Sequence, residues 1–306
     1  MEFNTDYSTH RSLVRMDPAP MPWPSGEFIA GGLRLKSFGK ADQDRLPLIS
    51  VITVVRNNAR QIGEAIESVI RQSYGNIEFI VADGASDDGT VDVLRKYDHC
   101  IDLWFSRPDK GIYDAMNTAL DFANGRYVHF LNSDDNYPHS RVIEIVMDEF
   151  RKSRPRWIHG NVIMLDKMKG RGWIRYSNVS KYYYLFKGMP QQAFFFEKRL
   201  YLEYSKFNLK YLIAADQDFL LRIMIKAGIS GKYLNIPVVV FDTCGISGNM
   251  ENKRSEVESI KAEYFPKWVL IFLDNDLFKK LLTNNEIRNR KKSIFEKIMK
   301  LLSFHS

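Results

Sequence analysis

Between residues 47 and 131, the chain alternates short apolar runs with segments whose apolar residues recur every three or four positions. Short apolar runs bounded by polar residues predict buried strands, and the three-to-four spacing predicts helices with one apolar face. The predicted strands are residues 49–55, 77–82, 101–105 and 127–131, and the predicted helices are residues 62–70, 90–97 and 112–120. This alternation predicts an α/β fold, with a mostly parallel sheet covered by helices on both faces.

The rest of the chain is less regular. Strand-like runs occur at residues 157–165, 193–196 and 233–241, and a helix is predicted around residues 218–227. Residues 18–24 are too rich in proline to be helical. We therefore expect three parts, which are an irregular N-terminal extension at 1–46, one α/β domain at 47–250 and a basic helical tail at 251–306.

Polar residues cluster where the predicted strands end. Ligands of parallel sheets bind beyond the carboxyl ends of the strands, so these residues are the first candidates for a site. They form three segments, at residues 83–90 (DGASDDGT), 108–117 (PDKGIYDAMN) and 131–135 (LNSDD). No G-x-G-x-x-G follows the first strand, which argues against a dinucleotide-binding Rossmann domain, and the absence of G-x-x-x-x-G-K-[ST] excludes the P-loop class.

In order and spacing, these three segments resemble the successive signatures of family 2 glycosyltransferases, which have the GT-A fold. The resemblance covers residues 47–241. It implies an inverting enzyme that moves a sugar from a nucleotide-diphosphate sugar, with a UDP-sugar favoured, to an acceptor hydroxyl. It also implies a place in bacterial polysaccharide or glycolipid synthesis, with a saccharide or a lipid-linked saccharide as acceptor.

The segment Asn132-Ser133-Asp134-Asp135 suits a metal site. A hard divalent cation held by carboxylate oxygens can neutralise a diphosphate while keeping coordination positions open for phosphate oxygens. The resemblance implies Mn²⁺ or Mg²⁺ bound by Asp134, with Asp135 as the second candidate ligand. The family's Asp-x-Asp pattern here reads Asn132-Ser133-Asp134, so Asn132 is expected to donate a hydrogen bond to ribose or phosphate. The alternative for this segment is an acidic turn that caps the next helix.

The donor nucleotide needs further contacts. Asp83 occupies the position at which the family accepts a hydrogen bond from the base, and an ionised carboxylate is an acceptor only. Lys110 is expected to reach toward phosphate, with a solvated loop charge as the alternative. The other candidates for donor binding are Thr53, Asn57, Asp114, Asn117, Ser133 and Gln192.

Inverting transfer also needs a carboxylate that takes the proton of the attacking hydroxyl. Residues 214–222 resemble the family segment in which a Glu-Asp pair opens a helix, although Ala215 stands in the place of the Glu. Asp216 aligns with the base, and Asp218 is expected to orient neighbouring groups. A helix cap is the alternative for Asp216. Upstream, Gln191 replaces the His of a His-Gln element.

Composition narrows the class only slightly. Lys and Arg number 44 against 37 Asp and Glu, and the net charge of +7 is compatible with nucleotide phosphates, an anionic membrane or nucleic acid. The two cysteines, Cys100 and Cys244, are expected to be reduced thiols. No run reaches the length of a membrane span, and no signal peptide is evident. We expect a protein of the cytoplasm or of the inner face of the cytoplasmic membrane, with no nucleic-acid partner and its oligomeric state open.

Residues 279–306 carry eight basic and two acidic residues, so most of the excess positive charge lies there. Their apolar residues fall near one face of a helix. A basic amphipathic helix can bind an anionic membrane surface, and it can equally pack on the catalytic domain or on a second subunit.

Two other classes stay open. A sugar nucleotidyltransferase usually has a glycine-rich basic loop after its first strand, and residues 56–60 contain no glycine. A carbohydrate-binding or scaffold protein with a degenerate site would account for Asn132, Gln191 and Ala215, which stand where the family has Asp, His and Glu.

Overall fold

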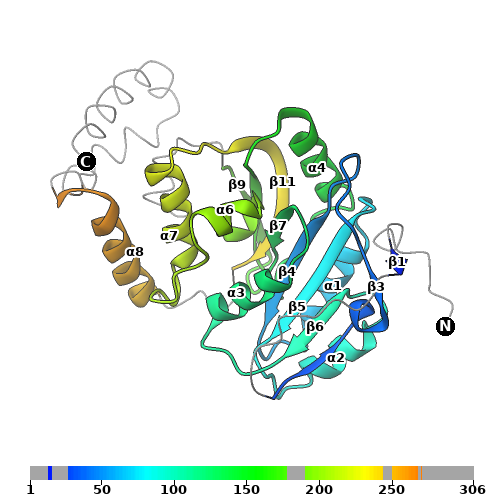
Figure 1. Ribbon diagram of the computed structural model, residues 1–306. Helices are drawn as coiled ribbons and strands as arrows, with labels where there is room; N and C mark the ends of the chain where they lie inside the picture. Colours follow the sequence, from blue (N-terminus) through cyan, green and yellow to red (C-terminus); the bar gives the residue numbers. More distant parts are fainter. Residues whose placement is uncertain (1–12, 16–26, 178–189, 244–249, 268–269, 271–306) are drawn as a thin grey trace.

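The computed structural model describes residues 13–15, 27–177, 190–243, 250–267 and 270. A nine-stranded sheet forms the centre of this described part, in the order β11-β8-β10-β7-β4-β5-β6-β2, with β9 paired to β8 (Figure 1). The strands of its first half are β2 (Ile29–Gly31), β4 (Ile49–Val55), β5 (Ile77–Asp83), β6 (Leu103–Ser106) and β7 (Tyr127–Phe130). Two short strands, β1 (Val14–Arg15) and β3 (Phe38–Gly39), pair in a separate sheet.

Four adjacent strands, β7, β4, β5 and β6, run parallel. Every residue of β4 and β5 is buried, which explains why both strands are continuous apolar runs in the sequence. All four predicted strands of this half are present, with ends displaced by two residues at most. The predicted α/β class with a mostly parallel sheet is confirmed.

Helices cover both faces of this sheet. They are α1 (Ile62–Ile70), α2 (Thr90–Lys96), α3 (Ile112–Phe122) and α4 (Val142–Ser153). The connections β4-α1-β5 and β5-α2-β6 step in one direction along the sheet, whereas β6-α3-β7 steps back across it. Right-handed crossovers therefore place α1 and α2 on one face and α3 on the other, where α3 contacts β4 and β5 (Figure 1).

The second half adds mixed strands and shorter helices to the same sheet. Its elements are β8 (Trp157–Asp166), β9 (Arg171–Arg175), η3 (Gln191–Ala193), β10 (Phe194–Glu197), α6 (Arg199–Glu203), α7 (Ala215–Leu221), η4 (Arg222–Lys226), β11 (Lys232–Asp242) and α8 (Met250–Tyr264). Antiparallel β10 lies between β7 and β8, and β11 runs parallel to β8. The helix expected around residues 218–227 begins at Ala215 and continues from Arg222 as a π-helical turn.

Residues 27–46 pack on the sheet, although the sequence places them in an extension. β2 pairs antiparallel with β6 and closes one edge. The Nζ atom of Lys40 lies 2.6 Å from Oδ2 of Asp102, and both side chains are buried. Removing one partner of such a pair would leave an uncompensated buried charge, so this contact ties the segment firmly to the domain.

The cysteines, membrane spans and the basic C-terminal segment can be compared with the sequence expectations only within the described residues. Cys100 is a buried free thiol, as a core residue should be, while Cys244 lies outside the described residues. Among the described helices, none is long and apolar enough to cross a bilayer. The basic segment at residues 279–306 also lies outside the described part of the chain.

Candidate active site

The carboxyl ends of β4, β5 and β6 are level with one another. Val55 lies opposite Asp83, and Asp83 lies opposite Ser106. Oδ2 of Asp83 accepts hydrogen bonds from the Ser106 hydroxyl at 2.6 Å and from the backbone N–H of Ser86 at 2.9 Å. The Ser86 hydroxyl donates to the other oxygen. The structure thus fixes the buried Asp83 carboxylate at the edge where the sequence predicts the donor base.

The loop after β4 joins this edge. The backbone N–H of Asn57 donates to Oγ of Ser86 at 2.7 Å, and Oδ1 of Asn57 accepts from the N–H of Asp87 at 3.0 Å. Asn57 has a φ of 52°, a left-handed conformation that Asn adopts more readily than most residues. Nδ2 of Asn58 donates to Oγ of Ser133 at 3.0 Å. Two predicted donor-site residues, Asn57 and Ser133, therefore meet at one edge through Asn58, which the sequence did not single out.

Thr53 and Asn132 carry buried oxygens that lack a hydrogen-bond partner within the described part of the chain. Buried polar atoms of folded proteins are normally paired, so such atoms are candidates for contacts with a bound molecule. Asn132 follows β7 closely and so lies at the edge. Thr53 lies inside β4, two residues before its end, and its side chain is fully buried.

The loop between β6 and α3 brings a second acidic segment to Asp83. A Cβ atom on Gly84 would lie 2.5 Å from Oδ2 of Asp109, so glycine permits this close approach. Burial raises the pKa of Asp109 above its usual range. Asp114 orders the loop by accepting from the backbone N–H of Lys110 at 3.1 Å and from Arg107 at 3.4 Å. The Lys110 residue itself is exposed, and its contact with phosphate stays a prediction.

Asn117 has a different environment from the one predicted. Its Nδ2 donates to the carbonyl of Phe207 at 2.9 Å, and its Oδ1 accepts from the N–H of the same residue at 3.0 Å. Both ends of the amide are engaged by the chain. Asn117 therefore positions the segment that leads into α7.

Asp135 is fully buried and held from two sides. Its Oδ2 accepts from Nε2 of Gln192 at 2.7 Å, and its Oδ1 accepts from the N–H of Asp242 at 3.1 Å. Burial and the neighbouring Asp134 raise its pKa well above the usual range. The carbonyl of Gln192 in turn contacts Nε2 of the buried His129 at 2.9 Å. Gln192 therefore joins the acidic segment to the sheet.

Asp134 stands in a crowded acidic environment. Burial and the Asp242 carboxylate raise its pKa, while Lys167 acts in the opposite direction. The Nζ atom of Lys167 lies 3.3 Å from Oδ2 of Asp242 and 3.6 Å from Oε2 of Glu64. The sequence analysis missed Asp242. The last predicted strand ends at residue 241, and Asp242 is the acidic residue that follows it directly. Its position at a strand end could have marked it as a candidate.

A divalent cation fits Asp134 better than Asp135. Burial raises the pKa of both carboxyls, with the Asp242 carboxylate adding to the shift of Asp134 and Asp134 adding to that of Asp135. Such a site is short of positive charge, which a bound cation would supply. Both oxygens of Asp135 already accept hydrogen bonds from the chain. In the part of the chain that the structure describes, no three His, Cys, Asp or Glu side chains converge as a preformed metal cage. Open coordination positions are what a site shared with a diphosphate requires.

The second carboxylate site lies on α7. The hydroxyl of Tyr113 is 2.8 Å from Oδ1 of Asp216 and 2.9 Å from the carbonyl oxygen of Ile213. Tyr113 belongs to the first turn of α3, directly after the loop that carries Lys110. This contact places Asp216, from the second half of the chain, at the carboxyl edge of the sheet.

Asp218 is engaged elsewhere. It is buried, forms an ion pair with Arg222 and accepts a hydrogen bond from the hydroxyl of Tyr264 at 2.7 Å. Arg222 donates further to three backbone carbonyls between residues 204 and 206. Asp218 thus joins α7 to α8 and to the preceding loop, which agrees with an orienting role.

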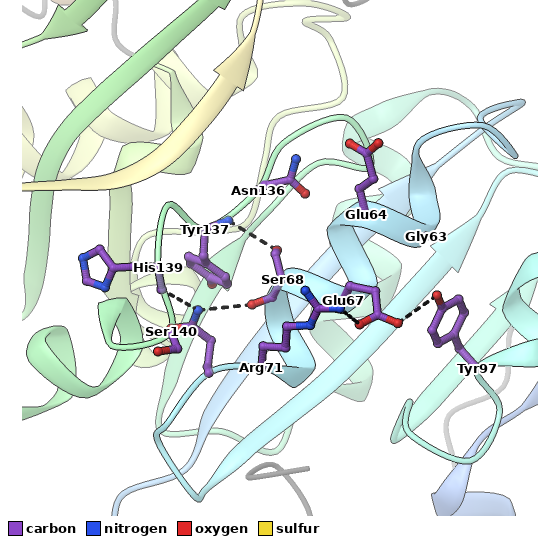
Figure 2. A pocket seen from close by; sticks show the side chains of 11 residues that line it. Gly63, Glu64, Glu67, Ser68, Arg71, Tyr97, Asn136, Tyr137, His139 and Ser140 are labelled. Atoms are coloured by element: carbon purple, nitrogen blue, oxygen red, sulfur yellow. Dashed lines mark hydrogen bonds and ion pairs between the residues drawn. The ribbon is translucent and has the colours of Figure 1, made fainter. Parts of the chain in front are cut away.

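A surface hollow of about 570 Å³ lies along α1 (Figure 2). Figure 2 shows Glu64 and Glu67 of α1 and the adjoining Arg71 between Tyr97 on one side and His139 on the other. None of the residues predicted for the site lines it. The residues predicted from the sequence therefore lie outside this hollow.

Solved structures share this fold. The chain superposes with a TM-score of 0.56 on residues 1–349 of Staphylococcus aureus TarS in complex with UDP, at 19% identity, covering 80% of this chain and 72% of that one. A mannosyltransferase of Pyrobaculum calidifontis, in complex with GDP-Man and Mn²⁺, gives a TM-score of 0.52 at 18% identity, covering 73% and 64%. The fold is that of GT-A glycosyltransferases.

Sequence comparisons give the family. The model of glycosyl transferase family 2 matches residues 50–211. An uncharacterized glycosyltransferase of Mycobacterium tuberculosis is 33% identical over 213 residues, covering 67% of this chain and 79% of the relative. A PGL/p-HBAD biosynthesis glycosyltransferase of the same species is 27% identical over 204 residues, covering 65% and 78%. The chain belongs to glycosyltransferase family 2, as the sequence motifs indicated.

Proposed function

We propose that this protein is an inverting glycosyltransferase that transfers a sugar from a UDP-sugar to an acceptor hydroxyl with the help of a divalent cation. The contact between Tyr113 and Asp216 carries the proposal. It brings a carboxylate of the second half to the edge where Asp83, Asn132 and Asp134 gather. Such a transfer needs a carboxylate that holds the cation beside the donor and a second carboxylate that acts as base toward the acceptor. Both would lie at this edge.

On the donor side, Asp134 would hold Mn²⁺ or Mg²⁺, with the Asp242 carboxylate close by. The cation supplies positive charge to the diphosphate leaving group. Asp83 offers acceptor oxygens to the base, and the exposed Lys110 reaches phosphate from the β6–α3 loop. Asn57, Asn132 and Ser133 line the same edge, and solved relatives in fold carry UDP, UDP-GlcNAc or GDP-Man. These contacts support a nucleotide sugar as donor.

On the acceptor side, Asp216 takes the proton of the attacking hydroxyl while that oxygen bonds to the anomeric carbon. The bond from the anomeric carbon to the diphosphate breaks in the same step, so the configuration inverts. The protonated Tyr113 hydroxyl keeps Oδ1 of Asp216 in place, because burial and Asp216 raise the pKa of Tyr113 well above its usual value. Asp218, held by Arg222 and Tyr264, supports the helix and does not take the proton.

We also propose a lipid-linked saccharide as acceptor, met at the membrane surface. The hairpin of β8 and β9 supports this. Residues 167–177 contain four basic residues and no acidic one. Met168, Trp173 and Tyr176 are 87%, 52% and 60% exposed, and aromatic and basic side chains together suit a membrane interface. Surface-polysaccharide or glycolipid synthesis agrees with the PGL/p-HBAD relative.

A donor panel tests the proposal. Full-length protein is mixed with Mn²⁺ and each of several UDP-, GDP- and dTDP-sugars, and thermal stability and nucleotide release are measured. One UDP-sugar should raise the melting temperature in a Mn²⁺-dependent way and yield UDP. Asp216→Asn should keep that thermal shift and lower turnover by about 10²-fold or more, whereas Asp218→Asn should mainly lower stability. Absence of both nucleotide binding and release across the panel would instead favour a degenerate scaffold.

A further inference from the structure

The helix that bears Asp216 has no capping side chain of its own. Ala214 is its N-cap residue and Ala215 its first residue, and neither side chain can accept a hydrogen bond from a backbone N–H group. The family pattern has an acidic residue at the position of Ala215. In this structure an acidic group from a different helix binds the backbone just before Ala215.

That group is the carboxylate of Glu256 on α8. Its Oε1 accepts from the backbone N–H of Leu212 at 2.8 Å, and its Oε2 accepts from those of Ile213 and Ala214 at 2.8 and 3.0 Å. Three consecutive N–H groups thus converge on one anion at the start of α7. Such charge-assisted bonds are about twice as strong as neutral ones, and the positive end of a helix favours them.

The same turn is held from its opposite side by Tyr113. The Tyr113 hydroxyl lies 2.9 Å from the carbonyl oxygen of Ile213, the residue whose N–H faces Glu256. Glu256 therefore fixes the N–H side of residue 213, while the Tyr113 hydroxyl, whose single proton is shared between two acceptors, contacts its carbonyl side. Asp216 follows three residues later and contacts the same hydroxyl.

We propose that Glu256 is a positioning residue for Asp216, acting through the turn at residues 212–214. The inference rests on the proposed role of Asp216 as the base. Glu256 touches backbone groups only, so its effect on transfer comes from where α7 begins. The match to the family's sequence model ends at residue 211. Helix α8 therefore lies outside the matched residues.

The experiment compares Glu256→Gln with Glu258→Gln in the full-length protein. The amide introduced by Glu256→Gln would keep one acceptor oxygen and turn an NH₂ group toward backbone donors, so the turn should loosen. Within the described part of the chain, Glu258 pairs only with Arg254 of its own helix, at 3.1 Å on an exposed face, and it offers a matched control. Hydrogen exchange of the amides at residues 212–214 should be about tenfold faster or more in Glu256→Gln and unchanged in Glu258→Gln.

Steady-state kinetics with the UDP-sugar that turns over in the donor panel give the second readout. Glu256→Gln should lower kcat by about tenfold or more and leave the donor KM unchanged, because misplacing a catalytic group impairs chemistry more than donor binding. Glu256→Asp, which keeps the charge, should recover part of kcat and serves in place of Glu256→Gln if that variant does not fold.

The outcomes separate the two proposals. Unchanged hydrogen exchange at residues 212–214 in Glu256→Gln would show that Glu256 does not hold this turn. Faster exchange together with wild-type kcat would overturn the positioning role. A wild-type protein that releases no nucleotide would reject the transferase function, and exchange alone would then decide whether Glu256 holds the turn.

Discussion

The Tyr113 hydroxyl and Oδ1 of Asp216 lie 2.8 Å apart, although 103 residues separate them in the chain. Tyr113 belongs to the segment that we propose binds the donor, and Asp216 to the helix that we propose serves the acceptor. This hydrogen bond joins the two halves of the candidate site, and it uses the hydroxyl that also contacts the backbone at residue 213.

Tyr113→Phe removes this hydroxyl and keeps the ring, which packs against Phe207. We expect kcat to fall by about tenfold, because Asp216 loses the donor that orients it, while donor binding is retained. Loss of one buried hydrogen bond should lower the unfolding free energy by about 1 kcal/mol. Kinetics and urea denaturation would measure both effects. A variant with lower stability but wild-type kcat would limit Tyr113 to packing.

Asp134→Asn and Asp135→Asn should behave differently. Asp134 carries the proposed cation, so its variant should fold normally and lose Mn²⁺-dependent UDP binding in calorimetry. Asp135 accepts two hydrogen bonds in a fully buried position, and an amide would turn an N–H toward one donor. We expect that variant to lose about 1–3 kcal/mol of stability. Unchanged Mn²⁺-dependent binding in Asp134→Asn would assign the cation to another residue.

His129 should lower the stability of the protein as the pH falls from 7 toward 4, whereas the raised pKa values of Asp109, Asp134 and Asp135 act in the opposite direction. Burial lowers the pKa of His129 to about 4, from an ordinary value of 6.5. Nε2 donates to the carbonyl of Gln192, and Nδ1 accepts from the Tyr137 hydroxyl, so the neutral ring satisfies both contacts. Between pH 6.5 and 4 the unfolded chain binds the proton and the folded one does not, which costs about 2 kcal/mol by pH 5.

Urea denaturation at pH 7 and pH 5 would check this effect. His129→Leu should be less stable at pH 7 and show a smaller loss on acidification. His159, whose pKa burial also lowers to about 4, contributes to the remaining loss. His139→Gln, a change on the exposed surface, serves as the control for replacing a histidine. An equal loss in His129→Leu and wild type would contradict the assignment.

The hairpin of β8 and β9 should contact anionic bilayers. Vesicles of phosphatidylcholine and phosphatidylglycerol with brominated chains quench tryptophan fluorescence on contact. Wild-type protein should be quenched at low salt, and Trp173→Phe should lose part of that quenching. Trp104 is 3% exposed, so Trp104→Phe should keep the wild-type response. Equal quenching in both variants would assign membrane contact to another part of the chain or exclude it.

The sequence predicted the parallel strands well, because strands buried on both faces are continuous apolar runs. β2 and β9 escaped prediction for the opposite reason. They are short edge strands with exposed residues, and their patterns resemble those of loops.

Among the candidate site residues, the location at a strand end could be predicted from local motifs, as Asp83 and Ser133 show, while their roles stay predictions. Contacts between distant segments could not. Tyr113 stands inside a recognised motif, yet its partner Asp216 can be found only by folding. Glu256 has no motif at all, since its carboxylate binds backbone N–H groups that any residue provides.

The pairing of β2 with β6 has a practical consequence for work on this protein. A fragment cut at residues 50–211, where the family match begins and ends, would lack β2, Lys40 and α7. It would leave β6 with an open backbone edge and Asp102 with a buried negative charge and no counterion. Strand edges of that kind recruit other chains, so we expect such a fragment to precipitate on expression. Recombinant versions should therefore begin before Phe28 and extend beyond Phe265.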